Sequence, residues 1–345
     1  MTHAQILWRR VARSRRVALG VTVLGLLALL GIFAELLAAP APVVFVGPRG
    51  VEILPAVLDE DAIAALSDAD LAARYADGAG VWPLVRHGPT RPTEAGPLAE
   101  PSRAHPLGTD ALGRDLAARL VYGARTALGL SLCAVLLGML LGVALGGLAG
   151  TQRGFWNDRL VGLVETVDTF PAIIVVALVR AIEREPSALS LVIAVAIVRW
   201  AEIARLVRAE VLHASTEDYV LAAKALGATD FRLFHRHILP NAVGPVIVSS
   251  VFGISSVVLL EAAISFLPMG APAQAASWGE TLAQAAKHPG ELRLLLLPGA
   301  LLLLTVGASY LLADALRDAV DARTVRTRDE LGNPSAPRAL AGRAD

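Results

Sequence analysis

Six long apolar runs dominate the pattern of hydrophobic and polar positions along the chain. They lie at residues 17–39, 126–150, 160–182, 188–206, 242–267 and 292–313. Each is close to the roughly 20 residues that a helix needs to cross a hydrocarbon core about 30 Å thick. The pattern therefore predicts an all-α, polytopic membrane protein with six transmembrane helices.

The fourth run is the least apolar of the six. Arg199, Glu202 and Arg205 follow its uncharged part at a spacing of three, which places them on one helix face. Glu202 can pair with either arginine there, and the long arginine side chains can reach toward the membrane surface. A structural, internally paired face is one interpretation and a role in gating is the other. The roles of these residues and of Asp168 stay open.

The basic residues predict how the chain is oriented. Short cytoplasmic segments of membrane proteins hold an excess of Lys and Arg, and Arg9, Arg10, Arg13, Arg15 and Arg16 precede the first run without an acidic residue. We therefore expect the N-terminus in the cytoplasm, and six spans return the C-terminus to it. A cleaved signal peptide is the rival interpretation, but the first run is longer than a signal core of about 7 to 15 residues.

An extracytoplasmic insert separates the first two runs. It is rich in Pro and Gly and more acidic than basic; residues 56–77 have helical spacing, whereas residues 86–106 favour an extended connector. The insert is either a docking surface or a solvated cap. The expected organisation is an N-terminus with the first span (1–39), the insert and an interfacial helix (40–122), a five-helix membrane domain (123–318) containing a cytoplasmic loop (210–241), and a cytoplasmic tail (319–345).

Composition agrees with a membrane chain and excludes several functions. Of 345 residues 55% are hydrophobic, and 31 basic residues balance 31 acidic ones, so nucleic-acid binding is not expected. The sequence has no phosphate-binding Gly-Lys loop and no His-Glu-x-x-His motif, and His235 and His237 point to different helix faces. We expect no catalytic residue, metal site or cofactor on this chain. The single cysteine, Cys133, is predicted to be buried without a disulfide.

The second run carries a glycine at every fourth position, at Gly138, Gly142, Gly146 and Gly150. This spacing places the glycines on one helix face, where the backbone of another helix can approach closely. We expect the row to serve helix packing rather than to line a pore.

A short polar segment between the fourth and fifth runs predicts two small helices. Residues 216–226 favour a helix capped by Ser215 or Thr216, Gly227 suits a left-handed turn, and residues 229–238 favour a second helix before Pro240. The first helix offers alanines with little side-chain bulk beside larger apolar anchors, as a partner's groove requires. The alternative is a simple connector on the membrane surface. The alanines are 222, 223 and 225, and the anchors are Leu221, Leu226 and Phe231.

At this loop the sequence resembles the permease subunits of binding-protein-dependent ABC importers, in the dipeptide, oligopeptide and nickel branch. The residues in that family's frame are Ala222, Ala223, Gly227, Leu239 and Pro240. Leu221 stands where the general pattern has Glu. Residues 105–126 resemble the segment that leads into the family's second span, and further matches continue in order to Arg323. Residues 268–270 and the insert at 40–104 depart from the family.

The block at residues 105–126 also fits an interfacial helix by its own pattern. Thr109 or Asp110 would cap it, and Asp110 with Arg114 and Asp115 with Arg119 are spaced to pair along it.

The resemblance implies the type I ABC importer permease fold, with a coupling helix that sits in a cleft of a separate ATPase. It implies ATP hydrolysis on two ATPase subunits or one fused ATPase, a homologous second permease, an extracytoplasmic solute-binding protein, and a bacterial inner membrane with its lipid. Peptide is the commonest cargo of similar chains, with nickel or another small solute open. The implied ATPase-coupling residues are Leu221, Ala222, Ala223, Lys224, Ala225, Leu226, Gly227, Ala228, Asp230, Leu239 and Pro240.

Two other classes of function remain as alternatives. A secondary transporter is expected to show inverted repeats, and a membrane scaffold needs no coupling element. Co-purification of an ATPase distinguishes a permease subunit from both.

Overall fold

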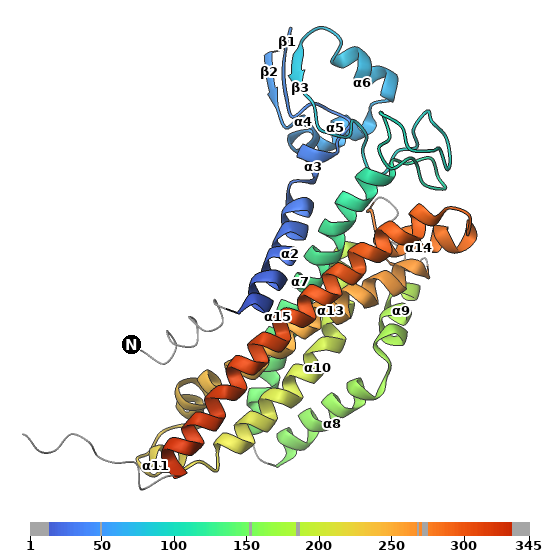
Figure 1. The fold of residues 1–345 in the computed structure, drawn as a ribbon. Coiled ribbons are helices and arrows are strands. Elements are labelled where there is room, and N and C mark those ends of the chain that lie inside the picture. Colours follow the sequence, from blue (N-terminus) through green and yellow to red (C-terminus); the bar gives the residue numbers. More distant parts are fainter. Residues whose placement is uncertain are drawn as a thin grey trace, which may run out of the picture.

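Long helices run in alternate directions along one axis, and a small unit of strands and short helices lies beyond one end of them (Figure 1). The computed structural model describes residues 14–48, 50–151, 154–183, 187–267, 269–270 and 275–332. Some positions used in the sequence predictions lie outside these ranges: Arg9, Arg10, Arg13, Pro268 and residues 333–345 of the predicted tail.

All six predicted apolar runs fall in helical segments. Among the described residues, four helices are long and apolar enough to cross a membrane, with the last one counted as far as Val320. These four are α2 (Arg15–Ile32), α7 (Leu116–Thr151), α13 (Leu239–Phe266) and α15 (Leu292–Gly332).

The third predicted run is a broken span. It forms α8 (Phe155–Thr169) and α9 (Ala172–Ile182), which are bent by 88° where they meet and which, taken as one span, are the fifth candidate. Pro171 causes the break, because it has no N–H to donate and forces Phe170 into an extended conformation, with φ −88° and ψ 133°. The prediction of one unbroken helix here is wrong.

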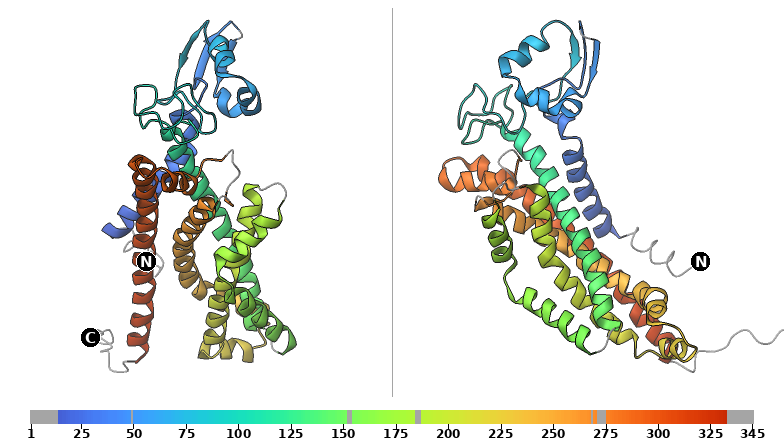
Figure 2. Two further views of the ribbon diagram at one scale, coloured as in Figure 1. Left: turned by 90° about the vertical axis from the view of Figure 1, so that its right-hand side faces the viewer. Right: turned by 180° about the vertical axis from the view of Figure 1, so that it is seen from behind.

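The fourth run forms α10 (Ala188–Ala214), which begins at a capping box between Ser187 and Ser190. Arg199, Glu202 and Arg205 keep it out of the group of apolar spans, yet it lies inside the bundle in contact with α7, α8, α9 and α13. Counting α10 and the broken pair, the chain passes along the bundle six times, as the two views of Figure 2 allow the reader to follow.

The glycine row of α7 lies against α10. A Cβ atom on Gly142 would lie 2.5 Å from Cβ of Ile203, one on Gly146 would lie 2.4 Å from the carbonyl oxygen of Ala204, and one on Gly150 would lie 2.5 Å from Cβ of Val211. Gly138 faces Arg199 in the same way, at 3.0 Å. Only glycine leaves room for the two backbones at these separations, so the row sets how closely the central helices pack.

The insert folds around its own small core. Its strands form a three-stranded antiparallel sheet in the order β2-β1-β3, which the sequence analysis missed because each strand has only three or four residues. The predicted helical stretch forms three short helices, and the predicted connector has no helix. The elements are β1 (Val44–Gly47), β2 (Gly50–Ile53), α4 (Pro55–Leu58), α5 (Glu60–Ala65), α6 (Asp68–Arg74) and β3 (Ala79–Val81).

One face of this sheet covers the side chains of the short helices. Phe45 packs edge to face on Tyr75, with ring centroids 4.9 Å apart, and Ile63 and Leu71 complete the buried cluster. Burial raises the pKa of Tyr75 to about 12, and its hydroxyl donates to Glu52 at 3.2 Å. The insert is therefore a folded unit and not a loose linker.

The segment that follows α2 is bonded to α7. The short helix α3 (Ala34–Leu37) carries Glu35, which accepts two bonds of 2.5 Å from the guanidinium of Arg125. Burial alone would raise the pKa of Glu35, but the hydrogen bonds from Arg125, a backbone hydrogen bond and the charge of Arg125 together outweigh it and lower that pKa. The same arginine donates to the carbonyl of Gly31 at 2.8 Å.

Cys133 corrects another prediction. Its side chain is exposed, not buried, because it lies on a face of α7 that the described residues leave uncovered. An apolar run predicts burial in lipid or protein, but it does not tell which of the two surrounds a given residue.

The α7–α10 contact generates a stability prediction. Gly146→Ala adds only a Cβ, which meets backbone atoms of Ala204, so we expect overpacking to lower the free energy of unfolding by about 1–3 kcal/mol. Gly129→Ala on the same helix meets nothing within 4 Å and should be neutral or stabilising by roughly 0.5–1 kcal/mol. Thermal unfolding of both variants in detergent measures the difference, and equal shifts would contradict this packing.

Candidate functional site

The predicted coupling loop (residues 210–241) lies at the end of the bundle opposite to the insert, beside the last turns of α15 (Figure 1). It contains α11 (Asp218–Ala225), a turn at Gly227, α12 (Asp230–Leu233) and a π-helix, η1 (Phe234–Ile238). Gly227 has a φ of +85°, a left-handed conformation that glycine adopts without strain. The turn therefore has the conformation that the sequence predicts.

The first small helix begins later than predicted. Its N-cap is Glu217, whereas Ser215 and Thr216 turn their hydroxyls back to the carbonyls of Leu212 and His213, both at 2.8 Å. A hydroxyl in that position donates to the preceding helix instead of capping the next one, so the predicted cap is wrong.

The second small helix does not end before the fifth span. Thr229 caps α12, which continues through η1 directly into α13. The N–H of Leu239 donates to the carbonyl of Phe234, five residues back, which is the hydrogen bond of a π-turn. Pro240 sits in the first turn of α13, where a missing N–H costs little. The prediction of a separate helix is therefore wrong, and the loop and α13 form one continuous element.

Large apolar side chains of the loop are open to the surroundings. Leu226 is 90% exposed, Phe231 73% and Leu221 50%. Two others, Val220 and Leu233, are buried and hold the loop on the bundle, and Asn241 donates to the Tyr219 hydroxyl at 3.1 Å. The remaining predicted coupling residues lie on the same segment and are exposed or half-buried: Ala222, Ala223, Lys224, Ala225, Gly227, Ala228, Asp230, Leu239 and Pro240.

Arg199, Glu202 and Arg205 of α10 take part in two ion pairs. Arg199 pairs with Glu202, three residues along the same helix, and Arg205 pairs with Asp168 at the end of α8. Glu202 also accepts a hydrogen bond of 3.1 Å from the hydroxyl of Ser249 on α13. Of the two partners predicted for Glu202 the structure selects Arg199, and it gives Asp168 a partner that the sequence did not indicate.

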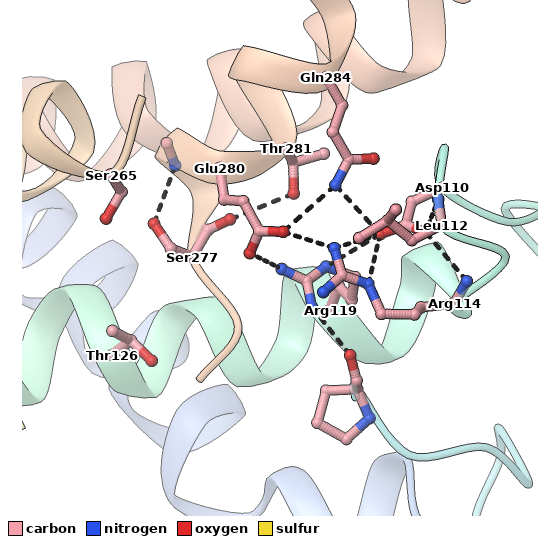
Figure 3. Close-up of polar contacts among 12 residues, drawn as sticks. Asp110, Leu112, Arg114, Arg119, Thr126, Ser265, Ser277, Glu280, Thr281 and Gln284 are labelled. Atoms are coloured by element: carbon pink, nitrogen blue, oxygen red, sulfur yellow. Dashed lines mark hydrogen bonds and ion pairs between the residues drawn. The ribbon is translucent and has the colours of Figure 1, made fainter. Parts of the chain in front are cut away.

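A second polar cluster lies at the insert end of the bundle (Figure 3). It joins the loop at residues 105–115, the first turn of α7 and the helix α14 (Trp278–Lys287). Asp110 is fully buried, and its two oxygens accept from the backbone N–H groups of Leu112 and Arg114, at 2.9 Å each, and from Arg114 Nε at 2.8 Å. This carboxylate holds the turn that leads into α7.

Glu280 joins the two buried arginines of the cluster. Its oxygens accept from Arg114 Nη2 and Arg119 Nη2, both at 2.5 Å, and Arg119 also donates to the carbonyl of Pro89 at 2.9 Å. Gln284 bridges the same groups, because it accepts from the N–H of Ala111 at 2.9 Å and donates to Asp110 at 3.2 Å. The two arginines and two carboxylates balance in charge, so α14 is fastened to α7 without an uncompensated buried charge.

This arrangement corrects the predicted interfacial helix. Residues 105–115 form turns and bridges, and α7 begins only at Leu116. The predicted pair of Asp110 and Arg114 is present, at 2.7 Å, but Asp115 does not hold Arg119. Asp115 instead accepts from the N–H of Ala118, which makes it the helix cap, and contacts His105 Nδ1 at 2.8 Å.

Sequence reasoning missed Glu280 and Gln284 as partners of this cluster. Their contacts lie more than 160 positions away along the chain, so no local spacing could reveal them. No group of three or more His, Cys, Asp or Glu side chains within the described ranges could hold a metal ion.

The polar cluster generates a prediction about stability. In Glu280→Gln, Arg114 and Arg119 lose their shared carboxylate, so we expect the free energy of unfolding to fall by about 2–4 kcal/mol. Glu291→Gln is the matched control: its side chain is 33% exposed against 31% for Glu280, and its partner Arg293 keeps bonds to two backbone carbonyls. That variant should lose less than about 1 kcal/mol. Thermal unfolding in detergent tests both, and equal losses would argue against the bridging role.

Comparisons with known proteins give the family. Residues 138–326 match the family described as binding-protein-dependent transport system inner membrane component. The chain is 37% identical to the dipeptide transport system permease protein DppC of Alkalihalophilus pseudofirmus, over 65% of this chain and 74% of that protein. It is 33% identical to the oligopeptide transport system permease protein OppC of Bacillus subtilis, over 64% and 72% of the two chains.

A third relative has another named solute. The glutathione transport system permease protein GsiD of Pectobacterium atrosepticum is 37% identical, over 64% of this chain and 73% of that protein. A solved amino acid ABC transporter with histidines covers 61% of this chain and 94% of its own, at 15% identity and a TM-score of 0.44, which is too low a likeness to support an argument.

The family match takes in more than half of the chain, and the resemblance inferred from the loop motif is thereby confirmed. The matched residues contain the glycine row, both ion pairs, the coupling loop and α14. The chain belongs to the family of binding-protein-dependent transport system inner membrane components and is a transmembrane permease subunit of an ABC importer.

Proposed function

We propose that this chain forms half of the route by which a peptide, or a related small solute, enters the cell, driven by ATP hydrolysed on a partner. The named solutes of the relatives are dipeptides, oligopeptides and glutathione, which supports a peptide as cargo. A homologous second permease would supply the other half, and an extracytoplasmic binding protein would deliver the solute.

The observation that carries the proposal is the exposed apolar surface of the coupling loop. Leu221, Leu226 and Phe231 project at the bundle end opposite to the insert, on a segment that also carries Lys224 and Asp230. Large apolar side chains that stay in water are a cost to the folded chain, and they are typical of a surface that a partner covers. The alanines between them let a partner's groove approach the helix backbone.

The ATPase would bind this surface and supply the chemistry. In this proposal the chain itself contributes no catalytic group, metal or cofactor, and two ATPase subunits or one fused ATPase hydrolyse the ATP. Closure of the ATPase would then push on α11 and α12. Such coupling requires that the ATP-bound partner interact more favourably with one conformation of the permease than with another.

Loss of the coupling surface should abolish ATPase association. Ala223→Glu places a long charged side chain in the contact, and Gly227→Val puts a β-branched residue at a φ of +85°, where it is strained. Each variant should lose at least about tenfold in affinity for the ATPase of its own transport system. Ala73→Glu, on the exposed face of α6 in the insert, is the matched control and should bind normally.

Pull-down of the tagged permease from detergent extracts measures that association. Both coupling variants should be inserted in the membrane in normal amounts. Retention of the ATPase by both would refute the assignment of this loop.

The orientation of the chain makes a separate prediction, because Lys224 and Lys287 are its only lysines. Lys224 lies on α11 and Lys287 at the end of α14, both exposed and at opposite ends of the bundle. If both termini are cytoplasmic, a membrane-impermeant amine reagent should modify Lys287 in intact, outside-out vesicles and Lys224 only in inverted ones. Mass spectrometry of the peptides reads both sites, and the reverse pattern would place the coupling loop outside.

A further inference from the structure

The ion pairs Arg199–Glu202 and Arg205–Asp168 lie on a face that the described residues leave partly uncovered. Exposed fractions are 60% for the Arg205 side chain, 39% for Asp168 and 43% for Glu202. The side chain of Arg199 is the least exposed of the four, at 14%, and it lies against Gly253 of α13. Figure 2 shows α13, α10 and the α8–α9 pair side by side on this face, in the view from the side of α8.

Glu202 contacts a helix, α13, that is long and apolar enough to cross a membrane. Glu202 accepts its hydrogen bond from Ser249, which follows the first residue of α13 by ten positions and precedes the last by seventeen. At 1.5 Å per residue Ser249 is about 15 Å from one end of this apolar helix and about 26 Å from the other. Glu202 therefore lies beside a turn well inside both ends of this apolar helix.

The broken span brings the other pair to the same face. Asp168 is next to the last residue of α8, and the chain then bends by 88° at Phe170 and Pro171. Phe170 itself is 55% exposed there. Irregular backbone inside a membrane is tolerated where it borders protein or a water-filled cavity, and broken helices are frequent at the solute sites of transporters.

Charged side chains that face lipid are costly, so they face a cavity or another protein instead. We propose that the face of α8, α10 and α13 around Asp168, Glu202 and Arg205 lines the aqueous route of the solute. We further propose that these side chains contact the charged groups of a solute that carries both an ammonium and a carboxylate. This inference rests on the proposed function, and it identifies the residues that meet the cargo.

The pairing explains how such a face can pass a solute without trapping it. In the absence of solute each charge has a partner within the chain, so no isolated charge attracts the cargo strongly. An incoming ammonium can take the place of Arg205 beside Asp168, and the released guanidinium can donate hydrogen bonds to the solute carboxylate. Weak, exchangeable contacts of this kind favour release as well as entry.

A purely structural role for the pairs is the competing explanation, and water access distinguishes the two. In a Cys133→Ala background we would place single cysteines at Phe170, which leaves both ion pairs intact, and at Arg205. Leu303, 75% exposed on α15, provides the control that should face lipid. A charged methanethiosulfonate reagent needs a hydrated thiolate. We expect it to modify Phe170→Cys and Arg205→Cys at least about tenfold faster than Leu303→Cys in vesicles with the assembled importer.

Charge reversal tests contact with the solute. The double variant Asp168→Arg with Arg205→Asp restores an ion pair in the opposite direction, so it should assemble and transport. Its preference between a lysine-containing and a glutamate-containing dipeptide should shift by about tenfold or more from that of the wild type. The single variant Arg205→Asp places a second carboxylate beside Asp168 without a compensating arginine, so it should lose most uptake.

Two results would overturn the inference. One is that Phe170→Cys and Arg205→Cys react as slowly as Leu303→Cys. The other is that the double variant keeps the wild-type preference between the two dipeptides. If the wild type takes up no peptide, the proposed cargo is wrong instead. The labelling experiment still decides whether this face borders water, because it needs no transported solute.

Discussion

The close approach of α7 and α10 is the contact on which the rest of the bundle depends. Four glycines spaced four residues apart leave one face of α7 without side chains, and backbone and side-chain atoms of α10 occupy the space. Association within a membrane gains little from burying apolar surface, because lipid is equally apolar, so dispersion contacts at short range must hold the helices together. With α10 fixed in this way, its charged residues face α8 and α13, and its end at Ala214 positions the coupling loop.

The polar cluster around Glu280 holds the helices together at the insert end of the bundle, through hydrogen bonds and ion pairs. Trp278 at the start of α14 is fully buried and donates from its indole nitrogen to the carbonyl of Leu120 at 3.0 Å. Together with Glu280 this fastens α14 across the first turns of α7. Each buried charge there has a partner of opposite sign, which matters because removal of one partner would leave the other charge buried and unpaired.

Sequence patterns predicted the features that depend on local spacing. The apolar runs, the glycine row and the left-handed turn at Gly227 all follow from residue type and position within a few turns of helix. The bend at Pro171 was within reach of the same reasoning, since proline disfavours a helical residue before it. The partners of Glu280, of Asp168 and of Ser249 were not, because each contact joins elements that only the packed bundle brings together.

The continuity of α12, η1 and α13 links the coupling loop to the intramembrane charges. An α-helix transmits displacement along its axis because its hydrogen bonds resist extension, whereas a π-turn followed by Pro240 provides a point where the direction of the helix can change. A push on Phe231 therefore reaches Ser249 through one helical element, which contains the π-turn and, inside α13, Pro245. Ser249 holds Glu202, whose own partner is Arg199. In the proposed function, a movement of the loop would therefore reach the paired charges of α10 through α13.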